Sequence, residues 1–235
     1  RGIVNSNIRL AQTRSMGTLF VRRVRHQRQT PLRKAESMVP ARLIICCCAL
    51  YIIIPIASAA DSWPVFHGPG GDGVVSRFLP VEWDSATNIA WRTEIPGEGW
   101  SSPVTVGDQI YLTTAIPSGE VPEDGKNQEY TLSMLILDAS SGRITRSVPI
   151  MEQTGERPAR IHRKNSHASP TPVIDGNRIY VHFGYQGTAC LSLSGDVLWM
   201  NRDLYFKPTH GNGGSPVLAA GNLIFTCDGD SEPKI

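Results

Sequence analysis

Beyond Asp61 the chain has no stretch of useful length with the hydrophobic periodicity of an α-helix. This absence argues against helical architectures and leaves the strand as the main element. The 22 glycines and 17 prolines of the 235-residue chain suit many tight turns rather than long helices. We therefore expect an all-β fold.

The chain also lacks any motif that specifies a reaction. Serine, histidine and aspartate all occur, but no nucleophile-elbow pattern accompanies them, so a hydrolase is weakly supported. The imidazoles of His167 and His210 suit zinc or copper, yet no third ligand stands at a telling spacing. These patterns predict no catalytic residue and no metal site.

A basic surface is missing from the body of the chain. Nine of the 23 basic residues and one of the 21 acidic residues lie in residues 1–37, which leaves 14 basic and 20 acidic side chains in residues 38–235. A nucleic-acid-binding protein needs its basic surface on the folded part. We therefore expect no nucleic-acid partner.

Residues 38–60 have the pattern of an export signal. Met38 is followed by one positive charge at Arg42, an apolar run over residues 43–56 and the A-x-A cleavage site Ala57-Ser58-Ala59. This pattern predicts that the rest of the chain leaves the cytoplasm.

Two interpretations of this segment stay open. In the first, translation begins at Met38, residues 1–37 are an over-extended start, and the signal peptide 38–60 is removed. In the second, residues 1–37 form a cytoplasmic basic arm and residues 43–60 an uncleaved membrane anchor. Both place the domain at 61–235 in the periplasm, in the cell envelope or in the medium.

Cysteine is scarce in the exported domain. Cys46, Cys47 and Cys48 belong to the apolar run, whereas Cys190 and Cys227 each lie near the end of a predicted strand. In an oxidising compartment the last two could form a disulfide. Alternatively, they are buried thiols that act as small apolar side chains.

The exported domain contains three copies of one pattern: a Ser/Thr-Pro-Val opening, a polar turn with glycine, and a second strand. Such turns favour β-hairpins. The three copies span residues 102–112, 171–181 and 215–225, with turns at Gly107-Asp108, Asp175-Gly176-Asn177 and Gly221-Asn222.

A second strand–turn–strand element follows each of the first two hairpins, over residues 135–144 and 189–199. Hairpin plus hairpin makes a four-stranded antiparallel unit, the architecture of a propeller blade. Residues 88–95 have the character of the last strand of a preceding blade.

The Pro-Val pairs lie 69 and then 44 residues apart, and the shorter interval is a normal blade length. The longer interval contains two polar insertions, at residues 116–130 and at about 151–164. Such insertions are places where binding surfaces are built, although solvated loops are the commoner outcome.

Several of these segments match one family pattern. They are Leu137-Asp138-Ala139-Ser140-Ser141-Gly142, Leu193-Ser194-Gly195-Asp196-Val197-Leu198-Trp199, the Pro-Val hairpins, and the opening Trp63-Pro64-Val65-Phe66-His67-Gly68-Pro69. Together they resemble the PQQ-like, or quinoprotein-type, β-propeller repeat of exported bacterial proteins. The resemblance implies a partial propeller of about two to three blades out of about seven or eight. Because an open arc exposes sheet edges, we expect a truncated product or part of a longer chain.

The chain departs from the family at two places. The family's blades end in a tryptophan that docks on the next blade. Trp199 takes this place, but Arg146 takes it in the earlier copy, so docking there is in doubt.

The family's quinone site also implies two adjacent cysteines and calcium ligands, and the adjacent cysteines here, Cys46 to Cys48, lie in the export signal. We predict no cofactor, and PQQ and Ca²⁺ belong only to an oxidoreductase alternative.

Polar and aromatic segments lead into the Pro-Val strands, and equivalent loops of a propeller lie on one face. They predict a ligand site made of Trp100, Asn165, His167, His210 and Asn212. The alternative is that these side chains only bond turns and pack.

We expect an exported, non-catalytic binding or scaffolding module that uses this face for a protein or small-molecule ligand. One alternative is a fragment of a PQQ-dependent oxidoreductase whose cofactor residues lie in missing blades. The other is an assembly factor for envelope proteins, which would capture β-strand peptides at a blade edge.

Overall fold

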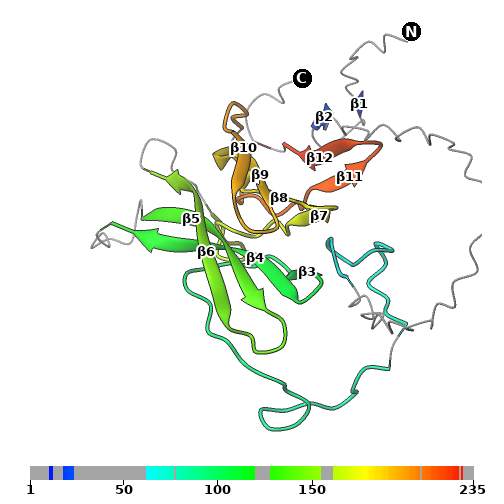
Figure 1. The fold of residues 1–235 in the computed structure, drawn as a ribbon. Helices are drawn as coiled ribbons and strands as arrows, with labels where there is room; N and C mark the ends of the chain where they lie inside the picture. The colour runs from blue at the N-terminus through cyan, green and yellow to red at the C-terminus, as the bar shows by residue number, and fades with distance from the viewer. Residues whose placement is uncertain are drawn as a thin grey trace, which may run out of the picture.

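The computed structural model describes residues 62–76, 78–119, 128–154, 161–206, 208–227 and 229, together with the backbone of two strands near the N-terminus. The described elements are strands in three four-stranded antiparallel sheets and one short 3-10 helix, η1 (Gly184–Gln186) (Figure 1). The all-β prediction is therefore confirmed.

The predicted export segment 38–60 lies outside the described residues. Within the described residues, no helix has both the length and the apolar character to cross a bilayer.

Two of the sheets are meanders in which each strand pairs with its sequence neighbour. The first has the order β3-β4-β5-β6 and contains β3 (Val104–Val106), β4 (Gln109–Ser118), β5 (Glu129–Asp138) and β6 (Ile144–Gln153). The second has the order β10-β9-β8-β7 and contains β7 (Val173–Asp175), β8 (Arg178–His182), β9 (Thr188–Ser192) and β10 (Val197–Asn201). Both predicted four-stranded units are therefore confirmed.

The third Pro-Val hairpin belongs to the remaining sheet. Its strands are β11 (Val217–Ala219) and β12 (Asn222–Thr226), and the sheet order is β1-β2-β12-β11, with β1 (Ala11–Gln12) and β2 (Thr18–Arg23). All three Pro-Val copies thus form antiparallel hairpins, as predicted.

The hairpin turns differ in backbone conformation. In the first two, the first loop residue has a positive φ, 56° at Gly107 and 58° at Gly176, as in type II′ turns. In the third, both Ala220 (49°) and Gly221 (74°) have positive φ, as in type I′ turns. This turn is therefore Ala220-Gly221, one residue earlier than the Gly221-Asn222 pair that the pattern predicts.

Two sequence expectations differ from the structure. The two ends of the first polar insertion belong to strands, because β4 and β5 stay paired as far as Ser118 and Glu129. Residues 88–95, expected as a last strand, are not in a strand, although Trp91 and Thr93 contact the turn between β5 and β6.

Apolar side chains fill the spaces between the sheets. One cluster joins the first two sheets and includes Leu132, Met134, Ile179 and Leu191, all at 0% exposure. A second cluster joins β8 and β9 to β12, with Tyr180, Cys190 and Phe225. Burial of each fully buried leucine, isoleucine or methionine side chain stabilises the fold by about 1.5–3 kcal/mol.

The edge strands β3, β7 and β11 form the inner edges of the three sheets. One repeated hydrogen bond links the residues that lead into these strands. The N–H of Ser102 donates to Oγ1 of Thr171 (3.0 Å), and the N–H of Thr171 donates to Oγ of Ser215 (2.9 Å). These three residues hold the same position, directly before Pro-Val, in the three copies. Strand β3 also lies against β7. The same contact therefore relates the first copy to the second and the second to the third.

The turn between β5 and β6 packs on Trp91. The indole N–H of Trp91 donates to the carbonyl of Ala139 (3.0 Å), and Oγ1 of Thr93 donates to the carbonyl of Gly142 (2.6 Å). Gly142 has φ 71°, and a Cβ at this position would overlap the Trp91 ring. Glycine is therefore needed there for both backbone conformation and space.

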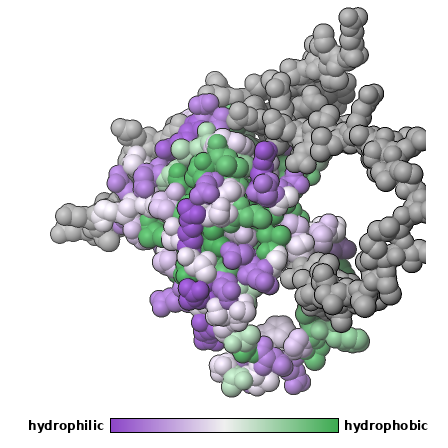
Figure 2. All heavy atoms as spheres, viewed as in Figure 1, coloured by the Kyte–Doolittle hydropathy of each residue, from purple (hydrophilic) through white to green (hydrophobic). Residues whose placement is uncertain are grey.

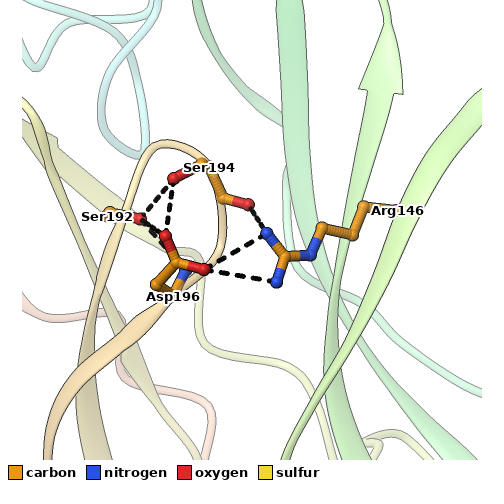
Figure 3. Close-up of polar contacts among 4 residues, drawn as sticks. All are labelled: Arg146, Ser192, Ser194 and Asp196. Atoms are coloured by element: carbon orange, nitrogen blue, oxygen red, sulfur yellow. Dashed lines mark hydrogen bonds and ion pairs between the residues drawn. The ribbon is translucent and has the colours of Figure 1, made fainter.

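The turn between β9 and β10 packs on β6 in a similar way, with Arg146 in place of tryptophan (Figure 3). The Arg146 guanidinium donates to the carbonyl of Ser194 and pairs with Asp196, with 3.3 Å between Nη2 and Oδ1. A Cβ on Gly195 would lie 2.8 Å from Cγ2 of Val148. The docking that the sequence left in doubt at Arg146 is thus made by an ion pair and a hydrogen bond.

Candidate ligand cleft

A cleft of about 1030 Å³ opens where the inner strands meet the opening segment of the described domain. Strands β7 and β11 and the loops before them form one side of the cleft, and the segment that begins at Trp63 forms the other. The lining residues are Val65 to Gly71, Trp100, Lys164, Asn165, Ser169, Thr171, Val173 to Asp175, and Gly213 to Leu218. All three Pro-Val copies or their leading loops therefore contribute to one cleft.

The opening segment is held against the inner strands by backbone hydrogen bonds. Trp63 exchanges two with Thr105, at 3.0 and 2.9 Å, and the carbonyl of Pro64 accepts from the N–H of Ile174 (2.8 Å). A turn then follows, closed by a bond from the N–H of Gly68 to the carbonyl of Val65 (2.9 Å). This segment therefore crosses from the first sheet to the second before it lines the cleft.

Aromatic side chains are exposed along the cleft. Trp100 is 57% exposed and Phe66 48% exposed, and the Phe66 ring stacks on the His67 ring with centroids 4.0 Å apart. Figure 2 shows apolar and hydrophilic residues intermixed on the face of the molecule that it displays. Exposed aromatic faces beside polar groups are well suited to bind a ligand that has both apolar and polar surfaces.

The polar part of the lining is organised by Asn165. Its Nδ2 donates to the carbonyl of His210 (3.0 Å), and its Oδ1 accepts from the N–H of Ser166 (2.9 Å) and from the hydroxyl of Ser169. The N–H of His162 also donates to the His210 carbonyl (3.2 Å). These bonds join the loop before β7 to the loop before β11.

Two of the predicted ligand residues lie at a different, smaller cavity. His167 and Asn212 line a cavity of about 10 Å³ together with Gln153 and Gln186, a volume that suits one water molecule. Nδ1 of His167 donates to Oε1 of Gln153 (2.8 Å), and its ring lies 4.1 Å from the Tyr130 ring. Burial lowers the pKa of His167 to about 4, so the imidazole is neutral at pH 7.

The five predicted residues are therefore divided among three places. Trp100 and Asn165 line the large cleft, His167 and Asn212 line the small cavity, and His210 lies in neither lining. The His210 ring meets the His162 ring edge to face, with centroids 5.3 Å apart.

The sequence pattern did not predict four of the residues that line the cleft: Phe66, Lys164, Thr171 and Ser215. The repeat itself carried a signal for the last two, because both are the Ser/Thr that precedes Pro-Val. Lys164 is the last residue of the second polar insertion, which the sequence marked only in general terms as a place where a binding surface can be built.

The two cysteines of the domain belong to the second apolar cluster. Cys190 is fully buried, Cys227 packs against the same cluster, and no disulfide joins them. Burial raises the pKa of the Cys190 thiol to about 11, as expected for a thiol that packs like an apolar side chain.

Among the described residues, no three histidine, cysteine or acidic side chains gather as metal ligands would. A scan of the chain against protein-family models finds no match, and a search of curated proteins finds none. The fold and the cleft thus define an all-β protein built of antiparallel four-stranded sheets with an aromatic and polar cleft at their inner edges.

Proposed function

We propose that the domain is part of a β-propeller of the PQQ-like type and that it acts outside the cytoplasm as a non-catalytic binding or scaffolding module. The cleft beside the inner strands would be its ligand site. The observation that carries this proposal is the shared cleft itself, because the second and third copies, the loop that leads into the first copy and the opening segment all line it.

The repeated inter-sheet contacts support the propeller. Ser102 bonds to Thr171 as Thr171 bonds to Ser215, so the same step relates successive copies. A structure that repeats one step around an axis places equivalent inner strands side by side. Ligand sites form where the loops of such strands meet.

The lining of the cleft supports binding rather than catalysis. Thr171 and Ser215 accept backbone N–H groups, and Asn165 bonds a backbone carbonyl. These polar side chains hold the loops in place and give the cleft a fixed shape, which favours recognition of a ligand.

The proposal is tested by ligand binding to the full chain and to Trp100→Ala. A panel of oligosaccharides, and separately PQQ with Ca²⁺, is titrated while bound ligand is measured by calorimetry. Trp83→Ala is the matched control, because Trp83 is 67% exposed and lies outside the cleft lining. We expect a ligand that Trp100→Ala weakens and Trp83→Ala does not; equal behaviour of both variants on every probe would refute the cleft as the site.

The same titration addresses the oxidoreductase alternative. Neither Cys190 nor Cys227 lines the cleft, and Asp175 is the one carboxylate among its lining residues, so a quinone site of the kind that the family resemblance implies would need residues beyond those that line this cleft. Quinone absorbance together with dye-linked alcohol oxidation in the presence of PQQ and Ca²⁺ would favour the oxidoreductase over the module.

A second candidate function is capture of an extended peptide at the edge strand β10. This strand pairs with β9 on one side, and three of its apolar side chains are exposed: Val197 (45%), Leu198 (52%) and Met200 (47%). Exposed apolar edges are sites for strand addition. A pull-down from envelope extract with wild type and Leu198→Lys tests it; recovery of the same proteins by both would count against this candidate.

A further inference from the structure

One five-residue pattern, His-Gly-x-Gly-Gly, occurs on both sides of the cleft. It stands once in the opening segment, at His67-Gly68-Pro69-Gly70-Gly71, and once before β11, at His210-Gly211-Asn212-Gly213-Gly214. Both copies contribute lining residues to the cleft. Because glycine has no side chain, a ligand can approach the backbone of both loops closely.

The second loop offers backbone donors to a ligand. Its start is anchored, since the His210 carbonyl accepts from His162 and Asn165. In the described part of the chain, the N–H groups of Gly213 and Gly214 make no hydrogen bond to protein, and both residues are exposed. Exposed backbone N–H groups without a protein acceptor can donate charge-assisted hydrogen bonds to an anion.

A positive side chain lies in the same cleft. Lys164 is exposed, lines the cleft, and forms no ion pair with another described residue. The carboxylate of Asp175 is also in the lining, and a carboxylate can accept hydrogen bonds from the hydroxyl groups of a ligand. The cleft therefore combines an ammonium group and backbone N–H donors with an acceptor.

The exposed aromatic rings define the remaining part of the ligand. The faces of Trp100 and Phe66 are suited to a flat apolar surface such as the C–H face of a sugar ring, and the hydroxyl and amide groups around them are suited to its hydroxyls. An anionic group on the same ring would meet Lys164 and the glycine N–H groups.

We propose that the cleft between the two His-Gly-x-Gly-Gly loops binds an acidic saccharide. The sugar ring packs on Trp100, and its carboxylate or sulfate is held by Lys164 and the backbone of Gly213 and Gly214. This inference rests on the proposed binding function and specifies the ligand class for that site. Uronates and sulfated sugars share the chemistry, and separate arms of the experiment distinguish them.

The experiment is calorimetric titration of the full chain with four probes: tetragalacturonate, a sulfated chondroitin tetrasaccharide, neutral cellotetraose, and inorganic sulfate alone. One of the two acidic tetrasaccharides should bind at least tenfold more tightly than cellotetraose. Added salt should weaken its binding, because part of the attraction is between exposed charges.

Matched variants separate the charge from the aromatic surface. Lys164→Gln should weaken acidic saccharide binding roughly tenfold, as expected for loss of a charge-assisted hydrogen bond, whereas Arg163→Gln, the exposed neighbour outside the lining, should leave it unchanged. Gly213→Ala should also weaken binding without unfolding the chain, because a Cβ there meets no atom within 4 Å.

The outcomes distinguish the two proposals. Equal binding of cellotetraose and the acidic probes, with loss in Trp100→Ala but not in Lys164→Gln, would overturn the acidic ligand and leave the binding function intact. Binding of inorganic sulfate with an affinity equal to that of the saccharides would also overturn it. No binding of any probe, by wild type or variants, would count against both.

Discussion

Two kinds of contact recur along the domain: an inner contact that is the same each time, and an outer contact that uses a different side chain each time. At the inner edge, Ser102 and Thr171 each donate a backbone N–H to the hydroxyl of the next copy. The outer contact is made at the turn between the last two strands of a sheet. Trp91 covers the turn between β5 and β6. Arg146 covers the turn between β9 and β10 (Figure 3). The inner contact depends on one hydroxyl at a fixed place, so any Ser or Thr satisfies it.

Either of two kinds of side chain can make the outer contact, because both turns present a backbone carbonyl as the hydrogen-bond acceptor. Both turns present a backbone carbonyl to a side-chain N–H, from Ala139 in one case and Ser194 in the other. An indole or a guanidinium can reach it. The two differ in the rest of the contact: the indole adds apolar area over Gly142, whereas the guanidinium adds an ion pair with Asp196.

The largest effect is expected at the glycine below the indole. Gly142→Ala should destabilise the fold by about 3 kcal/mol, because the residue has a left-handed backbone and the added methyl collides with Trp91. Gly107→Ala has a similar φ but meets no atom within 4 Å, so it should cost about 1 kcal/mol. Urea unfolding followed by circular dichroism measures both; equal losses would show that the Trp91 contact is unimportant.

The two docking side chains give the next comparison. Trp91→Ala should cost about 2 to 3 kcal/mol, since a partly buried indole and its hydrogen bond are lost. Arg146→Ala should cost less, because the exposed guanidinium and Asp196 (47% and 64% exposed) are screened by water. A larger loss for Arg146→Ala in the same urea experiment would reverse our ranking of the two contacts.

The inner contact should be sensitive to loss of a single oxygen. Thr171→Val keeps the shape of a side chain that is 2% exposed but leaves the N–H of Ser102 without its acceptor, which should cost about 1 to 2 kcal/mol. Thr145→Val is the control, because Thr145 is exposed and donates to the carbonyl of Ile136 (3.0 Å); it should change stability by less than about 0.5 kcal/mol. Indistinguishable unfolding midpoints would mean that the hydroxyl is dispensable.

The local structure was predictable from the sequence because its causes are local. Proline opens each hairpin, glycine supplies the positive φ of the turn, and alternating apolar residues set the face of each strand. The docking role of Arg146 was not predictable in this way, since its partner Asp196 is 50 residues away and an arginine pairs with many acids. Only the packing of one sheet on the next brings them together.

Only part of the candidate site was predictable from the sequence, because the rest depends on contacts between segments that are distant along the chain. The leading loops were expected to converge, and Asn165 does bond the loop of His210. The pattern could not show that His167 is directed to Gln153 and the small cavity, because that depends on the length of β6. Nor could it show that Phe66 reaches the cleft, since the path of the opening segment is set by its bonds to Thr105 and Ile174.

The smallest expected effect is a change of stability with pH, caused by one carboxylate in each of the two turns: Asp138 and Asp196. Asp138 accepts from the hydroxyl of Ser140 and from the hydroxyl and N–H of Ser141, which lower its pKa from 3.8 to about 2. The pKa of Asp196 is also lowered, first by the hydroxyls of Ser194 and Ser192 and then by Arg146. Both carboxylates are more acidic in the folded chain, so each stabilises the fold above about pH 4 and loses this contribution as the pH falls further.

Unfolding midpoints of wild type, Asp138→Asn and Asp196→Asn, measured from pH 6 to pH 2, test this difference. Each variant should be less stable than wild type at pH 6, and the gap should close below about pH 4, more slowly for Asp138→Asn because its pKa is about 2. Added salt at pH 6 should narrow the gap for Asp196→Asn, which includes an ion pair, and not for Asp138→Asn, whose partners are neutral. A salt response shared equally by both variants would mean that Arg146 and Asp196 act as independent surface charges, and the hydrogen bond to Ser194 would then be the whole of the Arg146 contact.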